Sequence, residues 1–198
     1  MRYWLPFLCC VCLTMMAHAQ IRVGLGGGYY TSTVDNEAID PNIDFQGAEN
    51  IDRWVGGYYA GGSAYLPITS ALALWTDLHI VQQRTARNGG LNTNNLSYFE
   101  FKPRLQYRFG EYLDIGVGPS IGYTPLRNSF GLRRETNFGI AAAAQVELGD
   151  FYIQGVYTHG LSNVAFGNVT VTDINGNAVF VEQRTRSIQL GIGYLWGI

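Results

Sequence analysis

Residues 98–108 read Tyr98-Phe-Glu-Phe-Lys-Pro-Arg-Leu-Gln-Tyr-Arg108, and two kinds of side chain alternate along the whole stretch. Tyr98 and the polar residues from Glu100 to Arg108 fall on one face of an extended chain, and the aromatic and aliphatic residues between them fall on the other. A period of two predicts a β-strand with one polar and one apolar face. Full charges on a strand whose other face is this apolar indicate a barrel in lipid, with its charges inside.

The first 19 residues have the pattern of a secretory signal peptide. Arg2 supplies a positive charge, residues 4–16 are largely apolar, and Ala17-His18-Ala19 is an A-x-A cleavage site. A retained membrane helix is the alternative, but a span needs about 20 apolar residues. A lipoprotein would need a cysteine after a complete apolar region. We therefore predict a signal peptide over residues 1–19 and one barrel domain over residues 20–198.

The composition limits what this domain can do. All three cysteines (Cys9, Cys10 and Cys12) lie in the predicted signal peptide, so we expect no disulfide and no cysteine-bound metal in the mature chain. Lys102 is the only lysine, whereas a soluble β-domain normally covers its surface with Lys and Glu. The net charge of −2 argues against nucleic acid as a partner.

Eight segments have the pattern of strands, and most are long enough to cross a bilayer at a tilt, which takes about 9–11 residues. They are Ile21 to about Tyr30, Arg53–Tyr65, Ala71–Gln83, Tyr98–Arg108, Leu113–Tyr123, Asn137–Leu148, Phe151–His159 and Arg186–Trp196. Tight connections at 66–70, 110–111 and 149–150 alternate with long polar ones at 31–52, 84–97, 124–136 and 160–185. Outer-membrane barrels show this alternation, with short periplasmic turns and long outer loops.

The fourth long loop contains a hairpin signal of its own. Asn175-Gly176 stands between two β-rich runs within residues 168–184. We expect this hairpin to stand above the membrane as an extension of the seventh and eighth strands. A ten-stranded barrel, with the hairpin in the wall, is the alternative.

Alternation alone leaves open which face is inside, because a lipocalin-like soluble barrel places its apolar face inward. Three features favour the opposite arrangement. The polar faces are dense in Gly, Ala and Ser, which suits a narrow interior. Tyr and Trp gather near strand ends, as in the aromatic girdles of membrane barrels. Lysine is nearly absent. The prediction is an all-β, eight-stranded antiparallel transmembrane up-and-down barrel in the cell outer membrane.

Several motifs resemble those of one family. Residues 98–109, Leu113-Asp-Ile-Gly-Val-Gly-Pro-Ser-Ile-Gly-Tyr123 and the segments from Phe138 to Asn163 are similar to the outer-membrane β-barrel domain of the PorT-like group. The resemblance covers essentially the whole mature chain. It implies a small closed barrel in a Gram-negative outer membrane, and some members of the group assist protein secretion. Outer-membrane strands usually end on an aromatic residue, whereas Gly197 and Ile198 follow Trp196 here.

The predicted inward faces carry four bases and four acids: Arg22, Asp77, Glu100, Lys102, Arg104, Arg108, Asp114 and Glu147. Isolated charges in a low-dielectric interior cost several kcal/mol each, so these residues must pair. The turn at 110–111 predicts Arg108 opposite Asp114, and we expect Asp77 near Arg104. The network is either a proton or ion path or a salt-bridged plug. We predict the plug, because an eight-stranded barrel has little free interior.

Candidates for catalysis and metal binding are few. His79 faces inward and is most simply part of the network. His159 and Ser162 lie close in sequence, but a lipid A hydrolase also needs an acid, and none is evident. Asp40-x-Asn42-x-Asp44 echoes a calcium loop, yet Phe45 takes the place of the required Gly. We expect no catalytic residue, metal or cofactor.

The long loops are the remaining candidates for binding. The first is acidic, and the third contains Arg127, Arg133 and Arg134. These arginines could pair with the acidic loop or bind phosphates of lipopolysaccharide. We expect a non-enzymatic barrel whose extracellular loops bind or scaffold a partner, such as an envelope or secretion protein. A small transport barrel for a hydrophobic or ionic solute and, more remotely, a lipid-modifying enzyme are the alternatives.

Overall fold

The computed structural model describes residues 20–38, 54–85, 94–123, 136–162, 170–172 and 178–197. The predicted signal peptide, most of the long loops and the arginines at 127, 133 and 134 lie outside these residues. The strands are β1 (Arg22–Ala38), β2 (Val55–Pro67), β3 (Leu72–Thr85), β4 (Asn94–Phe109), β5 (Leu113–Tyr123), β6 (Thr136–Leu148), β7 (Phe151–Gly160), β8 (Thr170–Thr172) and β9 (Ala178–Gly197). The described residues contain no helix long and apolar enough to span a membrane.

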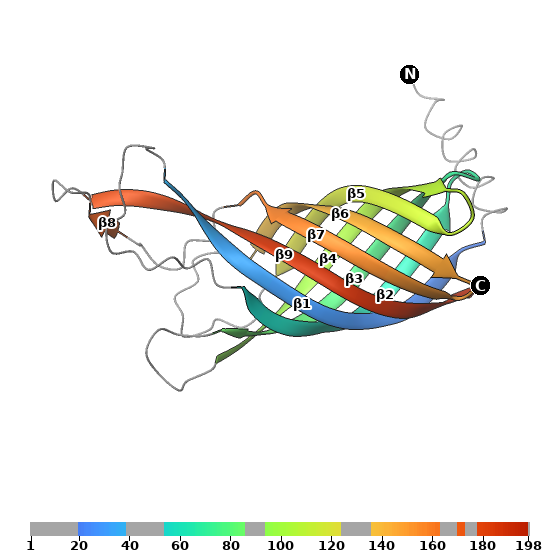
Figure 1. Cartoon of the computed structure of the whole chain (residues 1–198), viewed down its shortest axis with the longest axis horizontal. Coiled ribbons are helices and arrows are strands. Elements are labelled where there is room, and N and C mark those ends of the chain that lie inside the picture. Colours follow the sequence, from blue (N-terminus) through green and yellow to red (C-terminus); the bar gives the residue numbers. More distant parts are fainter. Residues whose placement is uncertain are drawn as a thin grey trace, which may run out of the picture.

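The strands form one closed barrel. Each strand from β1 to β6 pairs with the next, β7 pairs with β9, and β9 returns to β1, with every pair antiparallel. Figure 1 shows the resulting cylinder of tilted strands. Since β8 pairs only with β9 in the described chain, eight strands make the wall, as the sequence predicts.

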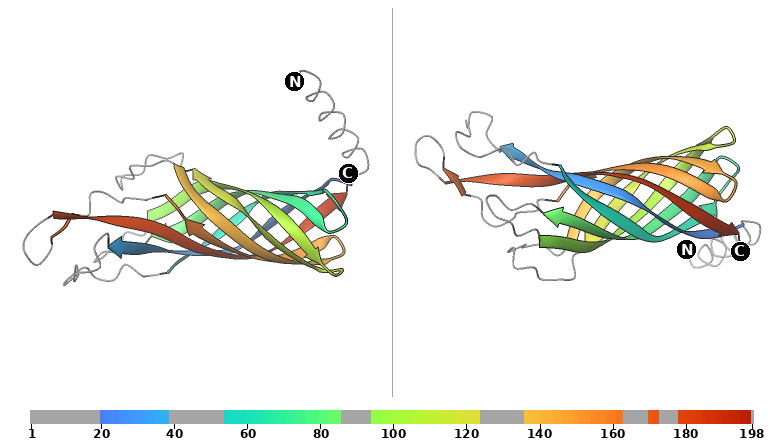
Figure 2. Two further views of the ribbon diagram at one scale, coloured as in Figure 1. Left: turned by 90° about the horizontal axis from the view of Figure 1, so that it is seen from above. Right: turned by 60° about the horizontal axis from the view of Figure 1, so that its bottom comes forward.

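The two ends of the barrel differ. The connections β2–β3, β4–β5 and β6–β7 are short and meet at one end, together with the end of β9 (Figure 2). Gly110 and Gly149 have φ values of +67° in two of these turns, a conformation that glycine adopts without steric cost. The short turns therefore mark the periplasmic end, and the long connections mark the outer end.

The first and last wall strands are longer than the sequence indicates. All 17 residues of β1 pair with β9, and the pairs from Val34–Thr185 to Ala38–Val181 lie beyond the last residues that pair with β2 and β7. β8 then pairs with the start of β9. The described part of the extension is therefore built from the first and last wall strands together with β8. The β8–β9 hairpin lies outside the eight-stranded wall, so the ten-stranded alternative was wrong. In β1 the alternation of apolar residues stops beyond Tyr30, whereas the backbone pairing with β9 continues to Ala38.

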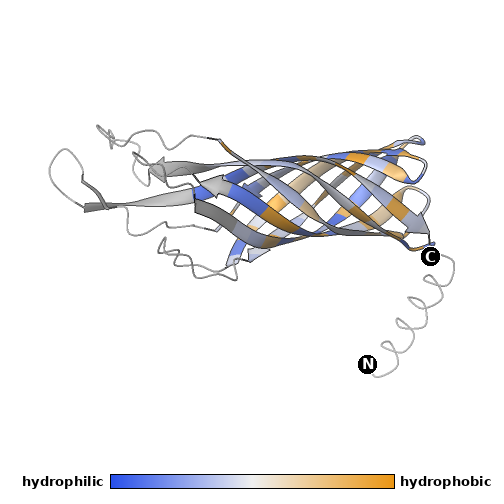
Figure 3. Ribbon diagram, turned by 90° about the horizontal axis from the view of Figure 1, so that it is seen from below, coloured by the Kyte–Doolittle hydropathy of each residue, from blue (hydrophilic) through white to orange (hydrophobic). Residues whose placement is uncertain are grey.

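The lipid-facing and interior faces follow the predicted alternation. Buried and exposed residues alternate along β5, β6 and β7, and apolar and polar segments alternate along the ribbon in Figure 3. The outward face carries aliphatic residues such as Leu25, Leu78, Val117 and Ile192, each more than half exposed. Outward aromatics gather toward the ends of the wall: Tyr29, Tyr58, Phe99, Tyr123, Tyr157, Tyr107, Phe109, Tyr112, Phe151 and Trp196. A polar interior inside an apolar belt with aromatic rims is the surface of a membrane-spanning barrel.

Inside the barrel, large side chains lie against glycines of the seam between β1 and β9. A Cβ placed on Gly193 or Gly26 would overlap Tyr152, and one on Gly191 would overlap the Tyr59 hydroxyl. The two tyrosine side chains therefore occupy the space that side chains on the seam would fill. Tyr152 on β7 thus covers its direct neighbour Gly193 on β9, and Tyr59 on β2 reaches over β1 to Gly191.

Candidate functional site

The first of three interior clusters lies at the periplasmic mouth. Arg108 donates two hydrogen bonds of 2.8 Å to the carboxylate of Asp114, which is opposite it as predicted, and lies 2.8 Å from Glu147. Arg22 donates to the same Glu147 carboxylate at 3.1 Å. The guanidinium carbons of both arginines lie within 6 Å of the Tyr65 ring centroid, at 5.9 and 5.6 Å. Two carboxylates and two guanidiniums thus tie β1, β4, β5 and β6 together across the mouth.

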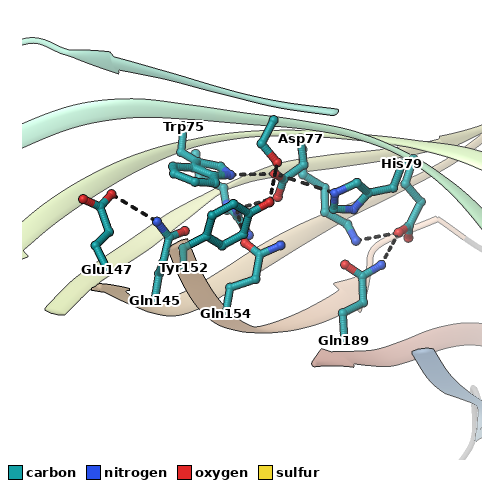
Figure 4. A network of polar contacts seen from close by, with 12 residues as sticks. Trp75, Asp77, His79, Gln145, Glu147, Tyr152, Gln154 and Gln189 are labelled. Carbon is teal, nitrogen blue, oxygen red and sulfur yellow. Dashed lines mark hydrogen bonds and ion pairs between the residues drawn. The ribbon is translucent and has the colours of Figure 1, made fainter. Parts of the chain in front are cut away.

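The second cluster centres on Asp77 in the middle of β3 (Figure 4). Its carboxylate accepts hydrogen bonds from Arg104 Nη2 at 2.5 Å, from Trp75 Nε1 at 2.6 Å and from Ser63 Oγ at 2.7 Å. His79 Nε2 lies 3.8 Å away. The expected proximity of Asp77 to Arg104 is present, although the directly paired residue on β4 is Lys102. One carboxylate therefore joins three strands.

The third cluster lies nearer the outer end. Lys102 Nζ donates to Glu100 at 2.5 Å, and Gln189 Nε2 on β9 donates to the same oxygen. The His79 ring lies against Tyr59, with centroids 4.6 Å apart. This cluster connects β4 to β9 across the lumen.

All eight predicted interior residues lie inside the barrel, and each acid contacts at least one base. The four pairings are Asp77–Arg104, Glu100–Lys102, Asp114–Arg108 and Glu147 with both Arg22 and Arg108. Lys102, Arg104, Asp77 and His79 have no exposed surface, whereas Arg22 and Arg108 keep 18% and 26% of their side chains exposed at the mouth. The network is thus charge-balanced and sealed in the middle.

The sequence did not reveal the apolar layers that flank this network. Toward the periplasm lie Tyr65, Ala73, Trp75, Tyr152 and Leu195, and toward the outer end lie Tyr30, Tyr59, Val81 and Tyr98. The face of the second predicted strand was ambiguous, because Gly and Tyr alternate there on both faces. The inward-facing glycines of β1 and β9 were a usable signal, because they leave room for large inward side chains on other strands.

Buried glutamines are a second component of the interior that the sequence did not reveal. Gln106, Gln145, Gln154 and Gln189 are each at most 2% exposed. Gln145 Nε2 donates to Glu147 at 3.3 Å, and Gln154 Oε1 accepts from Arg104 at 3.3 Å. These side-chain amides extend the hydrogen-bond network of the lumen beyond the ion pairs.

Ser162 and His159, the weak candidates for a hydrolase, do not form a catalytic pair. Ser162 Oγ donates to Asn137 Oδ1 at 2.5 Å and accepts from the Phe138 amide at 3.0 Å. Asn137 in turn donates to Thr185 at 2.9 Å. His159 lies on the outward face of β7, opposite Arg186. Ser162 therefore joins β6 to the end of β7 at the rim.

No metal-binding group of three or more His, Cys, Asp or Glu residues occurs in the described part of the chain. The acidic residues of the first predicted loop divide between two regions. Asp35 and Glu37 belong to β1, while those at 40, 44, 49 and 52 lie outside the described residues. The calcium-like motif and the arginines of the third loop likewise lie outside them.

Comparisons with known proteins return small outer-membrane proteins among solved structures. No family model and no curated protein matches the sequence. The fold is similar to that of Ail, the attachment invasion locus protein of Yersinia pestis, at 14% identity and a TM-score of 0.47 over 89% of this chain and 99% of that one. OprG of Pseudomonas aeruginosa aligns at 14% identity and a TM-score of 0.42, covering 91% and 97% of the two chains. OprH of the same species gives 13% identity, a TM-score of 0.42, and 90% and 100% coverage.

The membrane assignment follows from the barrel's own surface and interior. The wall is closed, so no backbone edge of the eight wall strands is left unpaired in lipid. Its outward face is an apolar belt with aromatic rims, and its charges are paired inside. Short turns at one end and long connections at the other are typical of outer-membrane barrels. The chain is a small eight-stranded, all-antiparallel β-barrel of the cell outer membrane.

Proposed function

We propose that this protein is a non-enzymatic, plugged barrel that anchors extracellular binding segments, as an accessory to protein secretion or envelope assembly. The observation that carries the proposal is the sealed network of ion pairs in the lumen. Asp77, Lys102 and Arg104 have no exposed surface. In a water-filled channel these side chains would be solvated, so their burial supports a plug.

The plug fits the energetics of buried charge. Removing two ions from water costs several kcal/mol each, and good geometry with further hydrogen bonds is needed to offset this cost. Asp77 has three hydrogen-bond donors, and Glu100 has two. A permeation path needs groups that can exchange partners with a passing ion, whereas these carboxylates already hold neighbours from several strands.

The outer end supports a scaffolding role. β1 and β9 continue as a paired ribbon beyond the wall, and β8 adds to it (Figure 1). This paired ribbon carries ordered backbone beyond the end of the wall, where a partner outside the membrane could bind it. The resemblance to the PorT-like group supports a partner in secretion. Lipopolysaccharide and an envelope or secretion protein are therefore the partners we propose.

Conductance in planar bilayers tests the plug. We expect wild-type protein to show no stable open channels, and the double variant Glu100→Ser/Lys102→Ser to show them, because it removes a buried pair without leaving a net charge. Phe101→Leu, on the outward face between them, is the control and should stay closed. Heat-dependent migration on a detergent gel verifies that each variant is folded. Stable open channels in the wild type would contradict the proposal.

A small transport barrel is the second candidate, and one observation favours it. Arg104 Nε and Nη1 and both polar atoms of the Gln106 side chain are buried without a hydrogen-bond partner among the described residues. Buried polar groups are normally satisfied, by water if not by protein, so water bound at these atoms would favour this candidate. Comparing the secreted proteins and the solute permeability of a deletion strain with those of its parent separates the two functions.

A further inference from the structure

The hydrogen-bonded ladder between β4 and β5 is interrupted in the middle of the wall. Its residue pairs stop at Phe101–Ile121 and resume at Leu105–Val117, so residues 102–104 of β4 and 118–120 of β5 are left out of the pairing. Each of the other ladders between neighbouring wall strands is continuous over its described length. We call residues 102–104 and 118–120 the proline seam, for the reason that follows.

Two prolines interrupt the ladder. The register of the flanking pairs places Pro103 directly opposite Pro119. The backbone N–H of Arg108 donates to the Ala71 carbonyl, on the β3 side, at 2.8 Å. Because the direction of backbone bonding alternates along a strand, the backbone of Pro103 faces β5. Residues opposed in this way normally exchange two hydrogen bonds, but proline has no N–H, so both bonds are lost. About 13 Å of strand is left without a hydrogen bond between β4 and β5.

The proline seam lies at the centre of the apolar belt. On the outward face of β4, Pro103 is midway between the exposed aromatic side chains of Phe99 and Tyr107. Proline is normally confined to the edges of sheets, because elsewhere it removes a ladder hydrogen bond. In the hydrocarbon of a bilayer no water is available to replace such a bond. Backbone cohesion between β4 and β5 is therefore lowest at mid-membrane depth.

The long side chains on the lumen side of β4 are tied to strands other than β5 at this level. Arg104 Nη2 donates to Asp77 on β3 at 2.5 Å and to Gln154 on β7 at 3.3 Å. Lys102 Nζ donates to Glu100 on its own strand at 2.5 Å. These ion pairs and hydrogen bonds hold β4 in place against β3 and β7, and they do not depend on the position of β5.

The neighbouring wall is small and uncharged on its lumen side. Gly118 of β5 pairs with Ala141 of β6, and Ala141 packs with Ala143 and Val156 in a small apolar cluster. The continuous β5–β6 ladder keeps β5 attached to this cluster. Parting β4 from β5 at the proline seam therefore breaks none of the ion pairs of the lumen.

We propose that the proline seam is a built-in point of local opening, at which β4 and β5 part toward the hydrocarbon of the bilayer. The strands remain joined on either side, by the pair Phe101–Ile121 toward the outer end and by Arg108–Asp114 at the periplasmic mouth. The ion pairs stay intact, so this opening faces the apolar chains of the lipid and creates no water path through the lumen. It goes beyond the proposed function, because neither the plug nor an extracellular partner requires it.

Amide hydrogen exchange, followed residue by residue by NMR on the refolded barrel in phosphocholine micelles, tests the proposal. The amides that bound the proline seam are those of Phe101, Leu105, Val117 and Ile121. The matched amides of the continuous β5–β6 ladder, at the same height, are those of Gly118, Ser120, Gly139 and Ala141. We expect protection factors at least about tenfold lower for the first set, since two hydrogen bonds that oppose opening elsewhere are missing there.

Returning the two donors is the complementary experiment. Pro103→Val/Pro119→Val restores both N–H groups and should raise the protection of the amides that bound the seam to that of the β5–β6 ladder. Pro67→Val, at the end of β2, is the matched control and should leave them unchanged. Heat-dependent gel migration shows that each variant is folded.

Two results would overturn the proposal. One is that, in the wild type, the amides that bound the proline seam are as protected as those of the β5–β6 ladder, a comparison that needs no variant. The other is that the double proline variant folds and leaves their protection unchanged.

Discussion

Replacing Asp77 with leucine is expected to lower the free energy of unfolding of the barrel by about 3–5 kcal/mol, because it leaves a buried Arg104 without its carboxylate. The guanidinium has no exposed surface, and Asp77 is its partner at 2.5 Å. Ser63 and Trp75 lose their acceptor in the same change. The midpoint of urea unfolding in lipid vesicles, followed by gel migration, measures the effect.

The double variant Asp77→Leu/Arg104→Met is the matched control. Removing both partners of a buried ion pair and filling the space with apolar side chains is often neutral or stabilising. We therefore expect the double variant to be more stable than Asp77→Leu alone. If it is no more stable than the single variant, the destabilisation does not come from an unpaired Arg104, and the ion-pair explanation fails.

Gly193→Val is expected to be the second most damaging change. A Cβ at this position would overlap the ring and hydroxyl of Tyr152, and overpacking a full core typically costs about 1–3 kcal/mol, occasionally more. Displacing Tyr152 would also disturb its contact with Trp75, whose ring centroid is 5.0 Å away, and with the Ser63 hydroxyl at 3.1 Å. Urea unfolding of the refolded barrel provides the measurement.

Gly197→Ala, four residues further along β9, is the control, because a Cβ there meets nothing within 4 Å. It should leave the unfolding midpoint unchanged. Combining Gly193→Val with Tyr152→Leu should recover part of the lost stability, since the smaller side chain gives the new methyl groups room. A loss from Gly197→Ala equal to that from Gly193→Val would show that β9 disfavours any side chain, and the packing argument would fall.

Strand number, strand order and face assignment were predictable because they depend on local patterns. A lipid-exposed strand must be apolar at every second residue, so Leu113–Tyr123 was predicted with its observed bounds. Charged residues on the opposite face had to pair, and the tight turn after Phe109 fixed Arg108 opposite Asp114. The strand bounds and this pairing follow from the two-residue period and the length of the turn alone.

Other parts depend on contacts between distant strands, and the sequence does not display them. Tyr152 on β7 meets Trp75 on β3 inside the barrel, but nothing in either strand's own pattern indicates this contact. The extension of β1 beyond Tyr30 also escaped prediction, because Thr33 to Ala38 lack the apolar alternation of a lipid-facing strand and are held by pairing with β9. The seal of the lumen therefore emerges only from the assembled barrel.

Thiol reactivity inside the lumen tests the central claim, a sealed interior, most directly. Residues 20–198 contain no cysteine, and Ser120 and Ser187 are inward-facing and each 4% exposed. In the folded barrel in vesicles, we predict that Ser120→Cys and Ser187→Cys do not react with a small water-soluble thiosulfonate until the protein is unfolded, while Glu111→Cys in the exposed turn reacts at once. Reaction of Ser120→Cys as fast as that of Glu111→Cys would show an open aqueous lumen and contradict the account.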